Sequence, residues 1–390
     1  MEYRVAVIGA TGRGGYGHQI DLSFDGVPGA RVVAVADSDL DGARACAART
    51  GAAAVYADYA EMLEKERPDI VAVCPRWCDQ RVDMVLAAVH SGAKAILCEK
   101  PMAADLARAD AIVEACSKAG VRMAVAHRRV SGYEIYAKRL IDEGTIGAVR
   151  MLKGYGKGDR RAGAEDFFVL GVHIMDSMRY FAGSDVVWAH GHITAGGRDV
   201  TAGDARELPE GIGPWAGDGV TAYYVFRNGV TGSYESYASD CPGSHRFGLD
   251  IYGETGIISL RDSPRGEMYL FPSGTWTPGE AGAWRRVHLP EWDNRPDGTP
   301  RSGKDWTLES NRMIAAEIVA ALNEDRELQG VSTAADARAA IEMIQAAHVS
   351  ALRKARVYLP LDVRRNPYAV PVHPATAGAN EPAAEWEGAN

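Results

Sequence analysis

Residues 3–17 read YRVAVIGATGRGGYG, a short apolar run that leads directly into a glycine-rich turn. A second apolar run, Val32 to Ala36, ends on Asp37, about twenty residues after the turn. This order is typical of a dinucleotide site, because glycines allow a close approach to a pyrophosphate and a carboxylate after the second strand accepts hydrogen bonds from a ribose. The pattern also predicts a helix after the turn, with its N-terminal N–H groups facing the phosphates.

The spacing of the glycines departs from the usual G-x-G-x-x-G, because Thr11 occupies the second glycine position. A simple glycine-rich turn is the alternative interpretation, but it would predict neither five glycines between residues 9 and 17 nor Asp37. Asp37 would repel the additional phosphate of NADP, and Ser38 and Asp39 provide no cation to bind it. NAD is therefore the expected cofactor, in preference to NADP.

Composition limits the other possibilities. A chain of 390 residues is long enough for two domains, and 46% hydrophobic residues with a mean hydropathy of -0.20 are ordinary for a soluble globular protein. A net charge of -9 disfavours a nucleic-acid partner. The sequence suggests neither a signal segment at its start nor an apolar run that spans a bilayer, so we expect a cytoplasmic protein without a membrane partner.

The cysteines favour buried free thiols over a metal site. Five of the six lie within the first 116 residues, and Cys74, Cys78 and Cys98 fall in or after predicted strands. The spacing of Cys74 and Cys78 is not a zinc spacing, so no metal is expected.

The first third of the chain alternates short β-rich runs with amphipathic stretches, which predicts a doubly wound parallel sheet of the Rossmann type. Six strands are expected, at 3–8, 32–36, 53–56, 70–74, 95–99 and 122–126. Helices are expected at 40–50, 59–67, 80–91 and 106–119.

The remainder predicts a mainly antiparallel α+β domain after a helix from Tyr133 to Glu143. Strands are expected at 220–226, 230–237, 247–252, 256–260 and 268–271, and late helices at 308–323 and 334–355. Asn228-Gly229 indicates a type I′ hairpin. The loop-rich stretches 196–217 and 272–304 are interpreted as lids or oligomer contacts. The predicted domains are 1–126 and 127–365, with a peripheral or disordered tail at 366–390.

Two positions are suited to proton transfer. Lys100 follows the fifth strand, at the sheet edge where open α/β folds bind ligands; beside a nicotinamide ring we expect its pKa to fall below about 10.4, although a surface lysine is the alternative. His173 and Asp176 lie three residues apart on a predicted helix from Gly171 to about Phe181. A structural histidine is the alternative there.

Together these segments resemble the Gfo/Idh/MocA oxidoreductase family, to about residue 365. The motifs that carry the resemblance are the opening glycine turn, Glu99-Lys100-Pro101, His127-Arg128-Arg129, the segment 141–147, Gly171-x-His173-x-x-Asp176 and the segment 358–361.

The resemblance implies a Rossmann domain and an open-faced sheet domain, with oligomers, a homodimer or homotetramer, formed through that sheet. It implies NAD(P) and a sugar or polyol as ligands, and hydride transfer between a substrate carbon and the nicotinamide. Lys100 would orient the sugar and His173 would accept the proton. The Lys100-Pro101 bond is expected to be cis, which such turns allow.

Two departures from the family pattern stand out. Polyol dehydrogenases of the family usually carry an aspartate four residues before the histidine, where this chain has Val169. Asp166 lies seven residues before His173 and would share a helical face with it if the helix begins early. The loop Pro75-Arg76-Trp77-Cys78-Asp79 is also bulkier than in most members, so Trp77 and Arg76 are expected either to contact ligand or to face solvent.

These arguments give the candidate site residues. Expected catalytic residues are Lys100 and His173. Expected cofactor contacts are Gly9, Thr11, Gly12, Arg13, Gly14, Asp37, Ser38, Cys74, Pro75, Trp77, Glu99 and Lys100. Expected substrate contacts are Lys100, Arg128, Lys153, Tyr155, Asp166 and His173. Lys157, Arg160 and Arg161 add to a basic concentration that would favour an acidic sugar if several of these side chains point inward, with a solvated rim as the alternative.

Three functions stay open from the sequence. The leading one is an NAD-dependent sugar or polyol dehydrogenase. The second is NAD-dependent glycoside cleavage by transient oxidation, elimination and re-reduction, which the replacement of the usual aspartate by Val169 leaves open. The third is a non-catalytic NAD-binding sensor or scaffold.

Overall fold

The chain forms two compact units, each assembled from separate stretches of sequence. The computed structural model describes residues 2–161, 163–238, 246–261, 266–276 and 284–372. The first unit comprises Met1–Val130, Pro209–Gly213 and Lys304–Arg338, and the second comprises Ser131–Leu208, Pro214–Gly303 and Ala339–Asn390. The predicted domains, 1–126 and 127–365, are continuous stretches, and their boundaries stay a prediction beside these units.

The first unit contains the expected parallel sheet, with the strand order β18-β6-β5-β4-β1-β2-β3. Its parallel strands are β1 (Tyr3–Ile8), β2 (Ala30–Ala36), β3 (Ala54–Tyr56), β4 (Ile70–Val73), β5 (Ala95–Cys98) and β6 (Arg122–Val125). β18 (Ser332–Thr333) adds a seventh, antiparallel strand beside β6, which the sequence did not predict.

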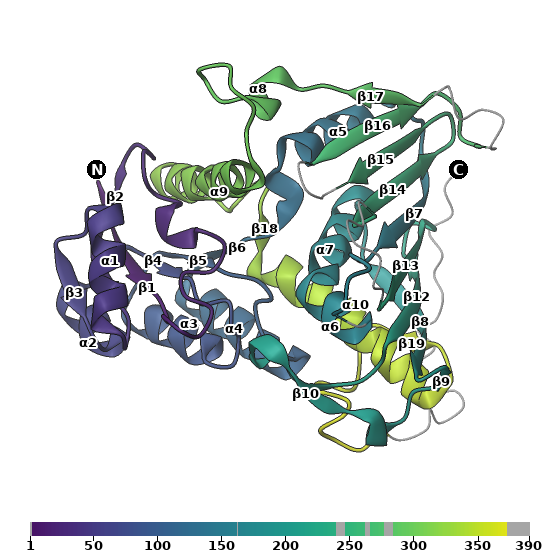
Figure 1. The fold of residues 1–390 in the computed structure, drawn as a ribbon, viewed down its shortest axis with the longest axis horizontal. Helices are drawn as coiled ribbons and strands as arrows, with labels where there is room; N and C mark the ends of the chain where they lie inside the picture. The colour runs from purple at the N-terminus through teal and green to yellow at the C-terminus, as the bar shows by residue number, and fades with distance from the viewer. Residues whose placement is uncertain (1, 162, 239–245, 262–265, 277–283, 373–390) are drawn as a thin grey trace. The chain divides into compact units, whose positions relative to one another are not determined.

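Helices cover both faces of this sheet, so its strands are almost fully buried (Figure 1). The helices are α1 (Leu40–Thr50), α2 (Tyr59–Glu66), α3 (Arg81–His90), α4 (Leu106–Ala119) and α9 (Gly303–Glu324). Val5 and Val7 of β1 share one core cluster with Cys46 of α1 and Ile314 of α9. The late helix α9 therefore belongs to the first unit and packs on the same sheet face as α1.

The segment after β1 corrects one prediction. An α-helix was expected after the glycine-rich turn, but only a short 3-10 helix, η1 (Ile20–Leu22), lies between β1 and β2. Gly12, Gly14, Gly15 and Gly17 have φ values between 56° and 89°, and Gln19 also has a positive φ of 65°. A right-handed helix cannot run through such positions, so the turn continues as irregular backbone.

The second unit is built on a ten-stranded sheet with the order β17-β16-β15-β14-β7-β13-β12-β8-β19 and β9 paired to β8. The strands are β7 (Val149–Tyr155), β8 (Val186–Ala195), β9 (Arg198–Asp199), β12 (Gly219–Phe226), β13 (Thr231–Tyr237), β14 (Gly248–Gly253), β15 (Ile257–Arg261), β16 (Glu267–Phe271), β17 (Arg285–Val287) and β19 (Val357–Tyr358). All pairs are antiparallel except β7 with β13, which confirms a mainly antiparallel sheet.

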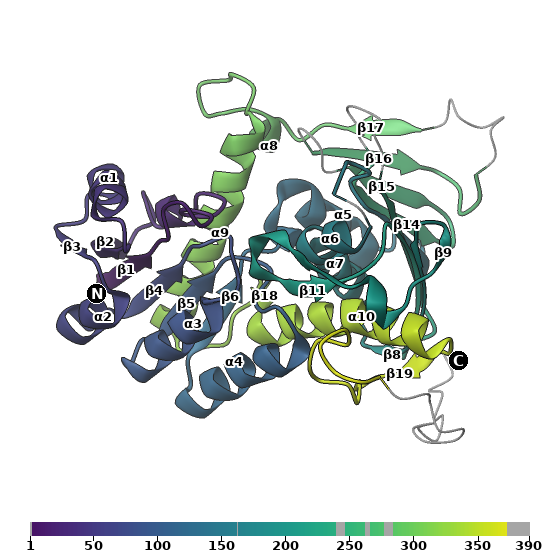
Figure 2. The ribbon, with the colours of Figure 1, turned by 60° about the horizontal axis from the view of Figure 1, so that its bottom comes forward.

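Helices pack on one face of this sheet (Figure 2). They are α5 (Gly132–Asp142), α6 (Gly163–Val169), α7 (Gly171–Ala182) and α10 (Ala334–Arg353), whose residues after Arg338 belong to this unit. Gly154 marks the covered face, because a Cβ there would lie 2.4 Å from Ile174 and 2.8 Å from Met178 of α7. The connecting segments contain β10 (Arg206–Leu208), β11 (Gly213–Trp215), α8 (Pro290–Asp293) and the short helices η2 (Arg128–Val130), η3 (Ala202–Asp204) and η4 (Pro209–Gly211).

The hairpin at Asn228-Gly229 forms, but the predicted turn type is wrong. A type I′ turn needs positive φ at both central residues, whereas only Gly229 has one, at 84°. The Phe226 N–H donates to the Val230 carbonyl at 2.9 Å, so three residues form the loop. Such a loop places a single residue in the left-handed region, and glycine fits it.

The described residues bear on three smaller predictions, one of them only in part. Cys46, Cys74, Cys78, Cys98 and Cys116 are free and buried as expected, and Cys241 lies outside the described residues. The tail after residue 372 also lies outside them, while Asn366 is buried and donates to the Pro214 carbonyl at 2.9 Å. A search of the described helices found none long and apolar enough to cross a membrane.

The contact between β7 and α7 gives a stability prediction. Replacing Gly154 with alanine should lower the free energy of unfolding by about 1–3 kcal/mol, because the new methyl group has no room against Ile174 and must displace α7. Urea unfolding of the full chain measures this. Gly203→Ala is the matched control, since its Cβ would meet only Thr201, at 3.7 Å. Equal stability of the two variants would contradict the close packing of α7 on β7.

Candidate functional site

The glycine-rich turn closes on itself directly after β1. The backbone N–H groups of Ala10 and Gly15 each donate to the other's carbonyl, at 3.0 and 2.9 Å. The Tyr16 ring packs over Gly9, where a Cβ would lie 2.2 Å from the ring. The guanidinium of Arg49 in turn covers the Tyr16 ring, 4.6 Å from its centroid. Side-chain packing therefore holds the turn in place of the absent helix.

Two glycines of the turn leave room for a ligand. A Cβ on Gly12 or Gly15 would meet nothing within 4 Å, so a pyrophosphate can approach their backbone. Gly14 is different, because a Cβ there would lie 2.7 Å from the backbone of Arg76 and 2.9 Å from that of Trp77. The open positions fit NAD, and Gly14 serves instead to dock the turn on the loop after β4.

Arg13 of the glycine-rich turn contacts the loop after β4. Arg13 pairs with Asp79 at 2.5 Å, and its guanidinium lies 4.9 Å from the centre of the Trp77 ring. Arg76 pairs with Glu210 of η4, and the Cys78 N–H donates to the Glu210 carbonyl at 2.9 Å. Arg76 and Trp77 thus contact Glu210 and Arg13, although the Arg76 side chain is still 42% exposed, and contact of either residue with a ligand stays a prediction.

Asp37 lies at the end of β2, as predicted, and is only 2% exposed. One carboxylate oxygen accepts from the Thr11 N–H at 2.9 Å and the Thr11 hydroxyl at 2.8 Å, and the other accepts from the Asp39 N–H at 3.0 Å. An ionised carboxylate has about four acceptor positions, and these contacts use three of them. Thr11, in the place of a glycine, thus orients the Asp37 carboxylate, whose contact with the cofactor stays a prediction.

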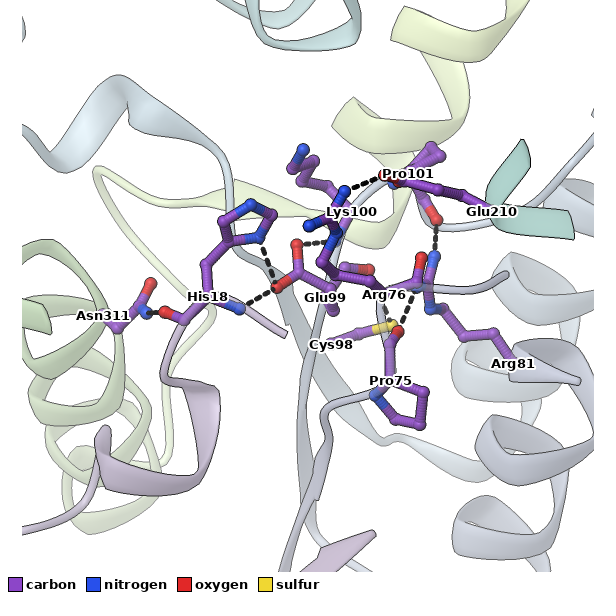
Figure 3. A network of polar contacts seen from close by, with 10 residues as sticks. All are labelled: His18, Pro75, Arg76, Arg81, Cys98, Glu99, Lys100, Pro101, Glu210 and Asn311. Atoms are coloured by element: carbon purple, nitrogen blue, oxygen red, sulfur yellow. Dashed lines mark hydrogen bonds and ion pairs between the residues drawn. The ribbon is translucent and has the colours of Figure 1, made fainter. Parts of the chain in front are cut away.

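The turn after β5 carries Lys100, which is 5% exposed, and its bond to Pro101 is cis as expected. The fully buried Glu99 carboxylate accepts from the Lys100 N–H at 2.9 Å, and from the N–H and Nδ1 of His18, each at 2.9 Å (Figure 3). Burial raises the pKa of Glu99, but the charge and hydrogen bond of His18, with Lys100 and Arg81, outweigh it and lower the pKa overall.

Arg81 reaches the same turn from α3 and is fully buried. Its guanidinium donates to the carbonyls of Pro75 and Pro101, and to that of Arg76 at 2.9 Å. The loop after β4 and the turn after β5 are thus fastened to one side chain (Figure 3). Cys74 lies beside them, but burial raises the pKa of its thiol well above the ordinary value, so only its backbone is suited to a ligand contact.

Sequence reasoning missed both His18 and Arg81. The importance of each residue follows from partners that are distant in the sequence, Glu99 for His18 and the Pro101 carbonyl for Arg81. Neither residue lies in a sequence motif that indicates a catalytic or binding role. Two weak signals were present: a histidine directly after the last glycine of the turn, and an arginine at the start of a helix that is otherwise mainly apolar.

In the second unit, His173 lies on α7 and is 7% exposed. Asp166 lies on α6, and Leu170 separates α6 from α7, so the condition that one helix begins early enough to include both Asp166 and His173 is not met. The Asp166 carboxylate accepts from the Lys157 N–H at 2.9 Å and the Ser236 hydroxyl at 2.5 Å. Burial raises its pKa, which these hydrogen bonds only partly offset.

The predicted substrate residues on β7 lie on the other face of the sheet. Successive side chains of a strand alternate between faces, and Gly154 faces α7, so Lys153 and Tyr155 point to the opposite side. There the Tyr155 hydroxyl donates to Asp250 at 3.0 Å. Arg161 pairs with Asp159 at 2.5 Å. An acidic sugar was expected only if several basic side chains point inward, and Lys153 is not one of them.

Arg128 lies on η2 in the first unit and is half-buried. The residues that the structure brings together in that unit are therefore the glycine-rich turn, Asp37, the loop after β4 and the Glu99-Lys100 turn. Their proximity provides a site for a dinucleotide with a lysine at the sheet edge.

Comparison with known proteins identifies related oxidoreductases. Residues 3–127 match the family described as oxidoreductases with an NAD-binding Rossmann fold, GFO/IDH/MocA, and residues 135–259 match the GFO/IDH/MocA C-terminal domain. The scyllo-inositol 2-dehydrogenase (NAD(+)) of Bacillus subtilis is 30% identical over 271 residues, which cover 67% of this chain and 75% of that protein. An inositol 2-dehydrogenase of Rubrobacter xylanophilus is 28% identical over 66% of this chain and 70% of its own.

Among solved structures, a levoglucosan dehydrogenase in complex with NADH and levoglucosan has a TM-score of 0.71 at 20% identity, over 92% of this chain and 100% of that one. The shared fold extends over both units. The two family models match residues 3–127 and 135–259, in the order that the glycine turn, the Glu99-Lys100-Pro101 motif and the His173 segment predicted. The chain belongs to the GFO/IDH/MocA family of NAD-binding oxidoreductases.

Proposed function

We propose that this protein oxidises a secondary hydroxyl group of a cyclic polyol or sugar with NAD, or catalyses the reverse reduction. The names of the inositol dehydrogenases that it resembles support a polyol as the substrate class. The observation that carries the proposal is the placement of Lys100, which shares the Glu99 carboxylate with His18 at the end of the glycine-rich turn.

The oxidation removes a hydride from the carbinol carbon and a proton from its oxygen, and leaves a ketone. NAD supplies the hydride acceptor at its nicotinamide ring when it is bound. The chain must therefore supply the proton acceptor and hold the hydroxyl in place. Lys100 is assigned to orient the hydroxyl and exchange its proton.

The family resemblance implies His173 of α7 as the alternative acceptor of this proton, and that role stays a prediction. Asp166 is not a simple replacement for the missing aspartate at Val169, because its carboxylate accepts from Ser236 and Lys157. The proposed role of Asp166 is therefore to fix the segment before α7, and contact with substrate stays a prediction.

A homodimer or homotetramer is part of the proposal. The sheet face opposite α7 exposes Tyr223, Tyr237 and Met151, which are 40%, 47% and 38% exposed. Large apolar side chains gathered on one face are typical of an association surface. The position of these three residues on alternating sites of β7, β12 and β13 supports association through this face.

Replacing Lys100 with methionine should reduce turnover of a polyol by about 100-fold or more, because the proton-exchanging amine is lost. NADH formation at 340 nm with a panel of inositols, sugars and aryl glycosides measures turnover. NAD affinity, measured by calorimetry, should change by less than about threefold. Lys94→Met is the matched control, since Lys94 precedes the same strand at its other end and pairs with Asp69 at 2.8 Å.

The same panel separates the alternatives. Release of aglycone without NADH would replace the dehydrogenase with redox-neutral glycoside cleavage. NAD binding without turnover of any compound would favour a sensor or scaffold. Full activity of the Lys100 variant would remove this residue from the mechanism.

Asp37 gives a prediction about the cofactor. Asp37→Ala should weaken NAD binding at least about tenfold, because a hydrogen bond to a charged acceptor is lost, and should improve the use of NADP relative to NAD. Calorimetry with each dinucleotide measures this on the free protein. Asp41→Ala, at an exposed position of α1 paired with Arg44, is the control. An unchanged NAD to NADP ratio would contradict the assigned ribose contact.

A further inference from the structure

The Glu99 carboxylate connects two turns that are distant in the sequence. Its Oε2 atom accepts from the N–H and the Nδ1 of His18, and its Oε1 atom accepts from the Lys100 N–H, all at 2.9 Å. An ionised carboxylate only accepts hydrogen bonds, so Nδ1 of His18 carries the proton in this contact. Figure 3 shows the imidazole of His18 and the backbone N–H of Lys100 bound to the same carboxylate.

The glycine-rich turn lies close to Glu99, and a side chain of α9 holds it there. Gly17 has a φ of 62°, and a Cβ there would lie 2.4 Å from Oε2 of Glu99 and 2.4 Å from the Cys74 carbonyl. The Asn311 side chain of α9 donates to the His18 carbonyl at 2.7 Å and is itself 4% exposed. The position of His18 is thus fixed from both sides, and its ring reaches Glu99 without a gap for water.

The charges around the lysine-bearing turn also favour this arrangement. The buried Glu99 carboxylate has His18 on one side, and the buried Arg81 guanidinium holds the Pro101 carbonyl just after Lys100. A buried carboxylate that lost a hydrogen-bond donor would be strongly destabilised, and its backbone contact to Lys100 would be free to change. The side chain of His18 is nevertheless 41% exposed, so most of it is not needed for core packing.

We propose that His18 is a positioning residue for Lys100 that acts through Glu99, so that the glycine-rich turn and the lysine-bearing turn behave as one hydrogen-bonded unit. The role of Lys100 itself rests on the proposed function. The essential atom of His18 is Nδ1, which faces Glu99, and not Nε2. Two hydrogen bonds from His18 fix the Glu99 carboxylate, and a third, from the Lys100 N–H, fixes the backbone of Lys100 on that carboxylate.

Asparagine and glutamine at position 18 test this assignment. The amide nitrogen of asparagine is attached to Cγ, as Nδ1 of histidine is, so His18→Asn keeps a donor at the required place. Glutamine places its nitrogen one atom further out, and leucine has none. His90→Leu, at an exposed histidine on α3, is the matched control.

The first measurement needs no activity. Hydrogen exchange of the full chain without ligand is followed at the Lys100 amide, which donates to Glu99. His18→Leu and His18→Gln should exchange this amide about tenfold faster or more, while His18→Asn and His90→Leu stay within about threefold of the natural chain. Equal exchange in all variants would overturn the proposal.

The second measurement is kinetic. With a polyol and NAD, kcat should fall about 10- to 100-fold in His18→Leu and His18→Gln, and KM for both substrates should change by less than about threefold. His18→Asn should retain kcat within about threefold. In the Lys100→Met background, His18→Leu should cause no further loss, because the two residues act as one unit.

An additive loss in the double variant, or equal kcat for His18→Asn and His18→Gln, would contradict the role of Nδ1. If the natural chain oxidises no polyol, the proposed function fails while the exchange of the Lys100 amide still decides the coupling. Circular dichroism of each variant confirms that it is folded before either measurement.

Discussion

The structure of the site depends on one buried negative charge, the Glu99 carboxylate. Burying a carboxylate is costly unless donors surround it, and here the donors come from His18 and from the backbone of Lys100. Satisfying this charge brings the glycine-rich turn to the end of β5, although about eighty residues separate the two in the sequence. The buried positive charge of Arg81 completes the arrangement from α3.

Much of the fold was predictable because it follows from local pattern. The apolar runs at Tyr3 and Val32 give parallel strands, and the glycines followed by Asp37 give the dinucleotide site. Local pattern also predicted the antiparallel strands of the second sheet and the helix that carries His173. These features need no knowledge of distant partners, since each is written within one stretch of sequence.

The remainder depended on contacts between distant residues. The glycine motif suggested a helix, but successive positive φ values excluded it, and Tyr16 packing replaced it. Alternation along β7 was evident, yet only the contact of Gly154 with α7 decides that Lys153 faces away. His18 and Arg81 were missed for the same reason. Their importance arises from Glu99 and from backbone carbonyls far along the chain, and a single sequence does not reveal such pairings.

The return of the chain to the first unit has a consequence for biosynthesis. α9 supplies Asn311, and β18 closes the edge of the sheet beside β6. A ribosome must therefore have released residues up to Arg338 before this unit is complete. Until then the nascent Rossmann sheet exposes the edge of β6 and the apolar face that α9 covers. A fragment ending near Val130 would carry the same exposed surface permanently.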